Sequence, residues 1–174
     1  ENRDEVIVAE AGEAVYLRKG DRYQVVTSSD KGYLFSSSSI VAGENEGPAL
    51  NLTVTPVKEG ASLSLNHITF PSNSAVLKES SFIELDRVTD LLLNNPGVII
   101  EISAHTDDVG NDAYNMTLSG KRAQSVLEYL QKKKIDSSRL QAKGYGETKP
   151  MVPNDSEANR ELNRRVELVI LKVN

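Results

Sequence analysis

The stretch that decides the fold is residues 101–130, which read EISAHTDDVGNDAYNMTLSGKRAQSVLEYL. Its beginning continues an apolar run that is typical of a strand, its middle is a polar loop around Gly110, and its remainder has the period of an amphipathic helix. Asp107 closes the predicted strand, and Arg122 follows fifteen residues later within the apolar stripe of the helix. An acid and a base in these positions predict a site for a ligand with charges of both signs.

Outward from this stretch, strands alternate with helices from residue 63 to the end of the chain. The pattern predicts strands at 63–70, 98–102, 140–145 and 165–173, and helices from Ser80 or Ser81 to 94, from 112 to 134 and from 155 to 162. Ser81 and Glu84 have the spacing of a capping box at the start of the first helix. This order predicts an α+β or α/β fold in which a mixed sheet packs against two main helices.

Residues 1–62 have a different rhythm, with short strand-like segments at 5–9, 14–17, 23–27, 33–35 and 50–55 separated by turn residues. This rhythm predicts a small all-β, sandwich-like segment that is short for a complete domain. The run Ser36–Ser39 is interpreted as an exposed loop. A stretch of Pro, Gly and charged residues at 56–62 places the domain boundary there, which gives domains 1–62 and 63–174.

Composition excludes several classes of protein. The content of 39% hydrophobic and 26% charged residues is ordinary for a soluble globular protein, and no apolar run approaches a membrane span. A net charge of −5 argues against sequence-independent nucleic-acid binding. The absence of cysteine excludes disulfides and thiolate sites, and two histidines leave little material for a metal centre, so neither a metal nor another cofactor is expected.

Arg122 is the most informative single residue. It shares one side of its helix with Leu118 and Val126, at spacings of four residues. A guanidinium at the edge of a core is costly unless it is paired, and Asp107 is a natural partner. The two residues therefore form either a structural salt bridge or a pocket in which Arg122 binds a ligand carboxylate and Asp107 a ligand ammonium.

Other polar residues near this pair allow two interpretations each. Asn115 and Ser119 lie on the same side of the helix, but Asn115 could equally be an exposed residue of the helix start. His105 and Asp107 suggest a metal or catalytic site, yet no third ligand or activated nucleophile accompanies them, and a hydrogen bond from His105 to the loop is the simpler interpretation. Neighbouring strand residues point to opposite faces, so one of Arg164 and Arg165 can face the pocket.

Many short motifs occur in one order along the second half of the chain. They are Asn73-Ser-Ala75, Glu84-Leu-Asp86, Asn95-Pro96, His105-Thr-Asp107 with Gly110, Tyr114-Asn115, Leu118-Ser119, Arg122-Ala123, Lys143-Gly-Tyr-Gly-Glu147 and Asn163-Arg-Arg-Val-Glu167. Over residues 66–174 the sequence resembles the OmpA-like peptidoglycan-binding domain, which OmpA-type porins, peptidoglycan-associated lipoproteins and flagellar stator proteins share. The resemblance implies a β/α/β/α/β mixed-sheet sandwich that binds the diaminopimelate of the peptidoglycan stem peptide noncovalently.

The resemblance also implies a set of site residues. Asp107 would take the ligand's ammonium and Arg122 its carboxylate, and the rest of the pocket would be lined by Asn73, Asn115, Leu118 and Arg164. The chain departs from the family at Pro71, where many members have Asp, which bears on contacts from that edge of the pocket. Residues 1–65 resemble, more weakly, the carboxypeptidase-regulatory-like β-sandwich that precedes this domain in Bacteroidetes-type OmpA proteins.

The sequence therefore predicts a non-catalytic tether between the outer membrane and the cell wall. Its partners would be the peptidoglycan stem peptide and, through regions outside this chain, the outer membrane, with no nucleic acid and with a possible homo-oligomer. It would be the periplasmic domain of an outer-membrane-associated protein of a Gram-negative bacterium. Two other classes stay open, a peptidoglycan amidase or peptidase that uses His105 and Asp107, and a structural or oligomerisation domain with a buried salt bridge.

Overall fold

The computed structural model describes residues 15–27, 32–41, 43 and 55–174. The predicted strand at 5–9 and most of the one at 50–55 lie outside these residues. Of the predicted strand at 14–17, residues 15–17 form no regular structure.

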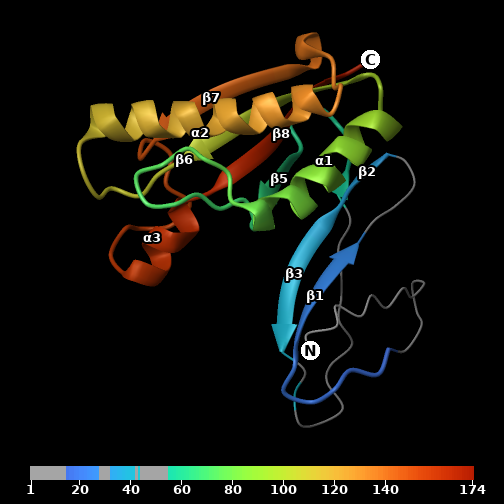
Figure 1. The fold of residues 1–174 in the computed structure, drawn as a ribbon, viewed down its shortest axis with the longest axis horizontal. Coiled ribbons are helices and arrows are strands. Elements are labelled where there is room, and N and C mark those ends of the chain that lie inside the picture. Colours follow the sequence, from blue (N-terminus) through green and yellow to red (C-terminus); the bar gives the residue numbers. More distant parts are fainter. Residues whose placement is uncertain (1–14, 28–31, 42, 44–54) are drawn as a thin grey trace.

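A four-stranded mixed sheet forms the centre of the molecule (Figure 1). Its order is β5-β8-β6-β7, with bounds Ser62–Leu65, Val166–Val173, Val98–His105 and Leu140–Gly146. β6 and β7 are parallel, whereas β8 is antiparallel to both β6 and β5. The parallel pair needs a crossover connection, and helix α2 supplies it. This is the predicted mixed sheet.

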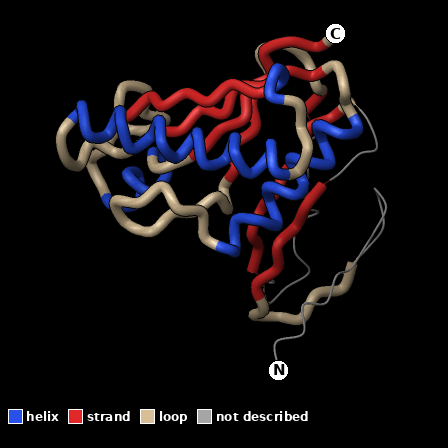
Figure 2. Tube along the Cα trace, turned by 45° about the horizontal axis from the view of Figure 1, so that its top comes forward, coloured by secondary structure: helices blue, strands red, loops and turns tan. Residues whose placement is uncertain are grey.

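The two main helices, α1 (Phe82–Asn94) and α2 (Asp112–Lys132), lie on the same face of the sheet (Figure 2). Alternate residues of β6 face them, and these are all buried: Val98, Ile100, Ile102 and Ala104. The helices contribute the buried residues Leu85, Val88 and Leu92 from α1 and Ala123, Val126 and Leu130 from α2. Burying an aliphatic side chain of this kind contributes about 1.5–3 kcal/mol, so this layer dominates the stability of the fold.

α2 begins and ends at clear local signals. The side chain of Asn111 accepts hydrogen bonds from the backbone N–H groups of Ala113 (2.9 Å) and Tyr114 (3.3 Å) at its first turn. The helix ends at Lys132, two residues before the predicted end, and Lys134 adopts a positive φ of 68°. The N–H of Ile135 then bonds to the carbonyl of Leu130, which lets Ile135 return to the core.

The first strand of the sheet is shorter than predicted, because β5 ends at Leu65 and the predicted strand ran to Phe70. The N–H of Ile68 turns back to the carbonyl of Leu65. Instead, the hydroxyl of Ser81 accepts a hydrogen bond from the N–H of Thr69 at 2.9 Å and donates one to the carbonyl of Thr69 at 3.3 Å. Residues 66–78 are therefore a loop, although the alternation of apolar and polar residues over 63–70 is typical of a strand.

The predicted capping box at the start of α1 is wrong. Ser81 has helical backbone angles and makes no capping hydrogen bond. It is the last residue of a short 3-10 turn, η1 (Glu79–Ser81), which precedes α1. Glu84 does not reach back to Ser81 but accepts a hydrogen bond from the N–H of His67 at 2.6 Å. Both members of the expected box thus bond to backbone groups of the 66–78 loop, most of which is exposed.

The N-terminal part forms two small antiparallel pairs, β1 (Arg22–Thr27) with β3 (Ser36–Val41) and β2 (Tyr33–Leu34) with β4 (Thr55–Pro56). The interpretation of Ser36–Ser39 as a loop is wrong, since these residues pair with Thr27, Val26, Val25 and Gln24 across the hairpin. Strand pairing uses backbone groups, so a run of serines does not prevent it. Leu34 and Phe35 are buried in the same apolar cluster as the residues of the sheet and helices.

Two short helical elements remain, one before β8 and one before β7. Helix α3 (Glu157–Asn163) is close to the predicted 155–162, and Ser156 caps it by accepting from the N–H of Asn159. A second 3-10 turn, η2 (Ser137–Arg139), leads into β7. Within the described residues, no helix is both long enough and apolar enough to cross a membrane.

Candidate functional site

The predicted site residues come from four segments that the fold brings to one end of the sheet. Asp107 follows β6, Asn115 to Arg122 lie on the N-terminal half of α2, Asn73 lies in the 66–78 loop, and Arg164 precedes β8. Figure 1 shows α3 at this end, beside the start of α2. The site is thus built from one strand end, one helix and two loops.

Asp107 is largely buried, with 8% of its surface exposed. Its Oδ2 atom accepts a hydrogen bond from Nη1 of Arg164 at 2.5 Å, and its Oδ1 atom accepts from the N–H of Val109 at 3.2 Å. The charge partner of Asp107 is therefore Arg164 rather than Arg122. The structural bridge between Asp107 and Arg122, one of the two alternatives that the sequence left open, is not found among the described residues.

Arg164 is held by several carboxylates at once. Besides Asp107, its Nη2 atom donates to Glu157 at 2.7 Å and to Glu161 on α3. Burial by itself lowers the pKa of Arg164, but the hydrogen bonds that Arg164 donates to Glu161, Asp107 and Glu157 outweigh it and raise the pKa above the usual arginine value. Arg164 is therefore a fixed cation, positioned by α3.

Arg122 has a different environment. Its Nε atom donates to the backbone carbonyl of Ser74 at 3.0 Å, and its guanidinium carbon lies 5.0 Å from the centre of the Phe70 ring. In the part of the chain that the structure describes, Arg122 forms no ion pair. Burial lowers the pKa of Arg122, and Arg164 adds to this, whereas Tyr114 and Asp107 act in the opposite direction. A partly buried cation thus lies at the site without a bonded carboxylate.

Asn115 is buried, with 3% of its surface exposed, so its interpretation as an exposed residue of the helix start is wrong. Its Nδ2 atom donates to Oε2 of Glu147 at 2.7 Å and to the carbonyls of Val109 and Asp107 at 3.3 and 3.4 Å. Asn115 therefore fixes the loop that follows Asp107 onto α2. Glu147, which sequence reasoning did not single out, completes this contact from the end of β7.

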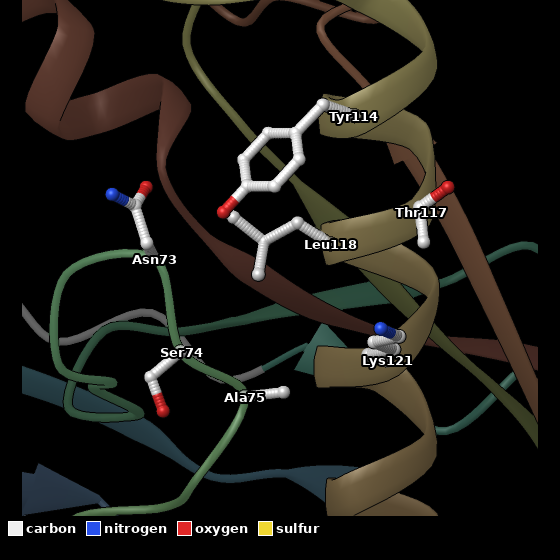
Figure 3. Close-up of a pocket in the computed structure, with 7 residues that line it drawn as sticks. All are labelled: Asn73, Ser74, Ala75, Tyr114, Thr117, Leu118 and Lys121. Carbon is white, nitrogen blue, oxygen red and sulfur yellow. The ribbon is translucent and has the colours of Figure 1, made fainter.

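A pocket of about 330 Å³ opens between the 66–78 loop and α2 (Figure 3). The loop contributes Asn73, Ser74 and Ala75, and the helix contributes Tyr114, Thr117, Leu118 and Lys121. In Figure 3, the Tyr114 and Leu118 side chains extend from the helix toward the loop. Asn73 has a positive φ of 54°, a conformation that Asn tolerates better than most residues. The Ser74 carbonyl bound by Arg122 belongs to the same rim.

Two of the predicted site residues, Asn73 and Leu118, line this pocket. Arg122 does not line it but bonds to the carbonyl of Ser74, which does. Asp107, Asn115 and Arg164 lie beside it and do not line it. The lining residues that sequence reasoning missed include Tyr114 and Lys121. Helical spacing offered a signal for both, since they are four residues before and three residues after Leu118.

Helix α2 lies unusually close to β7, and this contact sets the position of the site. A Cβ atom at Gly144 would lie 2.2 Å from the backbone nitrogen of Gly120. Beside it, the Ser119 side chain accepts a hydrogen bond from the N–H of Gly146 at 2.9 Å. Only a residue without a side chain at Gly144 allows this distance, so the glycine determines how deep the start of α2 lies.

Asn163, a second residue that sequence reasoning left without a role, positions the segment before Arg164. It is fully buried and accepts hydrogen bonds from the N–H groups of Met151 and Val152 at 2.8 and 3.2 Å. Its own amide donates to the carbonyl of Val152 and to the side chain of Asn154. The 150–155 loop is thereby tied to the end of α3, which fixes the direction of Arg164.

His105 is buried and stacks on Tyr145, with ring centres 5.2 Å apart and planes inclined by 8°. The expected hydrogen bond to the loop is wrong, because neither ring nitrogen has a hydrogen-bond partner among the described residues. The Nε2 atom lies 3.9 Å from Oε2 of Glu167. Burial, assisted by Arg165 and opposed by Glu167, lowers the pKa of His105 to about 4. No group of three His, Asp or Glu residues within the described ranges is arranged to hold a metal ion.

Comparison with known proteins places this geometry in a family. Outer membrane porin F of Pseudomonas fluorescens is 38% identical over 112 residues, which cover 64% of this chain and 34% of the porin, so the chain spans about a third of that relative. The structure of the cell wall anchor of the T6SS from Pseudomonas aeruginosa is 30% identical, with a TM-score of 0.55, over 64% of this chain and 80% of that one.

The crystal structure of the peptidoglycan-associated lipoprotein from Burkholderia pseudomallei is 28% identical, with a TM-score of 0.56, over 59% of this chain and 87% of that one. The family match itself extends over residues 69–164, more than half of the chain. It begins in the loop that carries Asn73 and ends at Arg164, so it includes every residue of the predicted site. On this match, the chain belongs to the OmpA family.

Proposed function

We propose that this chain binds peptidoglycan noncovalently and thereby tethers the outer membrane to the cell wall. The proposal is supported by its relatives, of which one is described as a cell wall anchor and another as a peptidoglycan-associated lipoprotein. The chain would act in the periplasm of a Gram-negative bacterium and reach the outer membrane through regions outside residues 1–174.

The proposed ligand is the diaminopimelate of the stem peptide, which carries an ammonium and a carboxylate on one carbon. Asp107 accepts from the ammonium, and Arg122 binds the carboxylate with its guanidinium. Asn73 and Leu118 line the wall of the pocket beside them. Asn115 holds the loop of Asp107 in place, and Arg164 keeps the Asp107 carboxylate oriented.

The unpaired state of Arg122 is the observation that carries this proposal. Its Nε atom is engaged by Ser74, but neither of its terminal nitrogens donates a hydrogen bond to any residue that the structure describes. A partly buried cation without a counter-charge is unfavourable, and a ligand carboxylate supplies that charge with two parallel hydrogen bonds. A residue whose only role was structural would be expected to have its own carboxylate partner.

The test is co-sedimentation of the protein with purified sacculi. Arg122→Ala is expected to weaken binding by about tenfold or more, because a charge-assisted bidentate contact is lost, and Arg122→Lys is expected to restore it only in part. Asp107→Ala is expected to weaken binding as well. Lys132→Ala serves as the control, since it removes a positive charge from an exposed position on the same helix.

A cooperative thermal transition in each variant separates loss of the site from loss of the fold. If Arg122→Ala and Asp107→Ala are folded and still sediment with sacculi like the unsubstituted protein, the proposed site is wrong. That result would favour the structural or oligomerisation role that the sequence leaves open.

The same incubation tests the enzymatic alternative. An amidase or peptidase would release soluble muropeptides, whereas a tether sediments without releasing them. The geometry favours the tether, because the carboxylate of Asp107 is engaged by Arg164 and Val109 and does not orient His105. Catalysis by His105 with Asp107 would need that contact.

A further inference from the structure

Lys121 is a pocket residue that the proposed binding of diaminopimelate leaves without a role. It lines the pocket between the 66–78 loop and α2, and its side chain is exposed there. It follows Leu118 by three residues and Thr117 by four, so helical spacing places all three on the side of α2 that borders the pocket (Figure 3). A ligand that occupies this pocket is therefore within reach of the Lys121 ammonium group.

The ammonium group of Lys121 forms no ion pair with any residue that the structure describes. Its neighbours one helical turn away carry no charge: Thr117, Leu118, Gln124 and Ser125. Lys133 on the same helix shows the contrast, because its Nζ atom lies 2.7 Å from the carboxylate of Asp86. Lys121 thus has its charge available for an anion that comes from outside the described chain.

The rest of the pocket wall also suits an anion. None of the seven residues that line the pocket is acidic. The side-chain amide of Asn73 and the hydroxyl of Tyr114 have no hydrogen-bond partner among the described residues, and both groups can donate. A pocket with an ammonium group and free donors, but without a carboxylate of its own, favours a ligand whose groups accept hydrogen bonds and carry negative charge.

The charge of the ligand can be counted against the charges of the site. The group of diaminopimelate that Asp107 and Arg122 are proposed to bind has one ammonium and one carboxylate, so it carries no net charge. Arg122 takes that carboxylate, which leaves Lys121 without an anion. The stem peptide has two further carboxylates, one on the γ-linked glutamate before diaminopimelate and one on the alanine at its C-terminal end. Either of them can supply the missing charge.

We propose that Lys121 binds a second carboxylate of the stem peptide while Arg122 holds the carboxylate of the diaminopimelate end group. The inference rests on the proposed function and adds a specificity to it: a peptide whose second carboxylate is free binds more tightly than one in which that carboxylate is amidated. Amidation removes the negative charge and replaces one acceptor oxygen by a donor, but it keeps the shape of the group. It is therefore the chemical change that tests this contact.

The test measures the affinities of three synthetic tetrapeptides by isothermal titration calorimetry. All have the sequence alanine, γ-linked glutamate, diaminopimelate and alanine; one is unmodified, one is amidated at the glutamyl carboxylate and one at the C-terminal carboxylate. The unsubstituted protein is expected to bind one of the amidated peptides about two- to fivefold more weakly than the unmodified peptide, which is the usual effect of an exposed ion pair.

In Lys121→Met, which removes the charge and keeps an apolar stem, this loss is expected to disappear, and the peptide for which it disappears identifies the carboxylate. In Lys121→Glu, that amidated peptide is expected to bind more tightly than the unmodified one. Lys132→Met is the matched control, because it makes the same change at an exposed residue of α2 that does not line the pocket, and it should keep the loss. Equal affinities of the unsubstituted protein for all three peptides, or the same loss in Lys121→Met, overturn the proposal.

The same titrations separate this inference from the function on which it rests. Arg122→Ala is expected to weaken the binding of all three peptides by a similar factor, because they share the carboxylate that Arg122 binds. If the three peptides bind the unsubstituted protein equally well and Arg122→Ala weakens them all, the role of Lys121 is wrong while the proposed function holds. If none of the peptides binds, the proposed function is contradicted and the inference falls with it.

Discussion

Asp107, Arg164 and Arg122, the charged residues of the proposed site, differ in how they are held. Arg164 is held by Glu157 and Glu161 as well as by Asp107, so it need not leave when an ammonium approaches Asp107. Arg122, in contrast, is held by two contacts within the described part of the chain, the hydrogen bond of its Nε atom to Ser74 and the packing of its guanidinium on the Phe70 ring. The acid of the site is therefore preorganised, and the base has its binding groups free.

His105 makes a prediction at the same scale. Burial lowers its pKa to about 4 in the folded protein, whereas the ordinary value of 6.5 applies in the unfolded chain. As the pH falls, the unfolded chain therefore takes up the proton first. The stability that the neutral ring contributes is present above pH 6.5 and is lost as the pH falls toward 4. The loss is on the order of 3 kcal/mol.

The variant His105→Phe keeps an aromatic ring against Tyr145 and removes the titration. Its free energy of unfolding, measured by urea denaturation at several values between pH 6.5 and 4, is expected to fall less steeply than that of the unsubstituted protein. His67→Phe, the same change at the other histidine of the sequence, controls for the general effect of acid. Equal slopes for His105→Phe and the unsubstituted protein would contradict a buried neutral His105.

At the scale of elements, the contact between α2 and β7 carries the site. Two glycines meet there, Gly120 on the helix and Gly144 on the strand, but only one of them needs to be glycine. A Cβ atom at Gly144 would meet backbone atoms at 2.2 and 2.7 Å, whereas a Cβ atom at Gly120 has no atom within 4 Å. The two positions therefore differ in what a methyl group does to the fold.

Gly144→Ala is expected to destabilise the protein by about 2 kcal/mol or more, because α2 has to move away from the strand. It should also weaken sacculus binding, since the moved helix carries Arg122. Gly120→Ala is the matched control and is expected to stabilise the protein by about 0.5–1 kcal/mol through the higher helix propensity of alanine. Chemical denaturation of both variants checks this, and equal effects would show that the contact does not fix the helix.

At the scale of the whole molecule, the N-terminal segment is connected to the sheet by more than the chain. Leu34 and Phe35 are buried in the common core. The N–H of Gly60 bonds to the carbonyl of Ile170 on β8, and the N–H of Ile170 bonds to the carbonyl of Ala61. The N–H of Gly32 donates to the side chain of Asn95 at the end of α1. The division into domains 1–62 and 63–174 stays a prediction, and these contacts suggest how to test it.

Leu34→Ala is expected to lower the free energy of unfolding by about 2–5 kcal/mol, the usual effect of emptying a buried leucine site. If residues near Leu34 fold together with the sheet, the unfolding transition of the sheet, monitored at Tyr145 and at the amides of β6, moves to lower denaturant in Leu34→Ala. Tyr33→Ala, at a neighbouring residue that is 43% exposed, is the control and should have little effect. A transition of the sheet that stays in place in Leu34→Ala would support two independent domains.

Local patterns were enough to predict most of the elements. The apolar period of α2, the buried run of β6 and the alternation of β8 each lie within one segment, and the structure confirms these elements near their predicted bounds. The mixed sheet with two main helices also followed, because the order of strands and helices limits how their apolar faces can be buried. The order of the motifs likewise agreed with the family match over residues 69–164.

The errors concern groups whose partners are remote in sequence. Residues 66–70 alternate like a strand, but the Ser81 side chain binds their backbone, and Glu84 binds His67 instead of its predicted capping partner. Arg122 bonds to a carbonyl 48 residues away, and Asp107 to an arginine 57 residues away.

Hydrophobic period and turn chemistry act locally, so the sequence was enough to predict most of the elements, their order and the charged residues of the proposed site. The pairing of Asp107 with Arg164, and the lack of a carboxylate at Arg122 among the described residues, became visible only in the tertiary structure. The reason is geometric, since hydrogen bonds and ion pairs need contact within a few ångströms. That contact is set by how the 66–78 loop, α2 and α3 pack together at the end of the sheet.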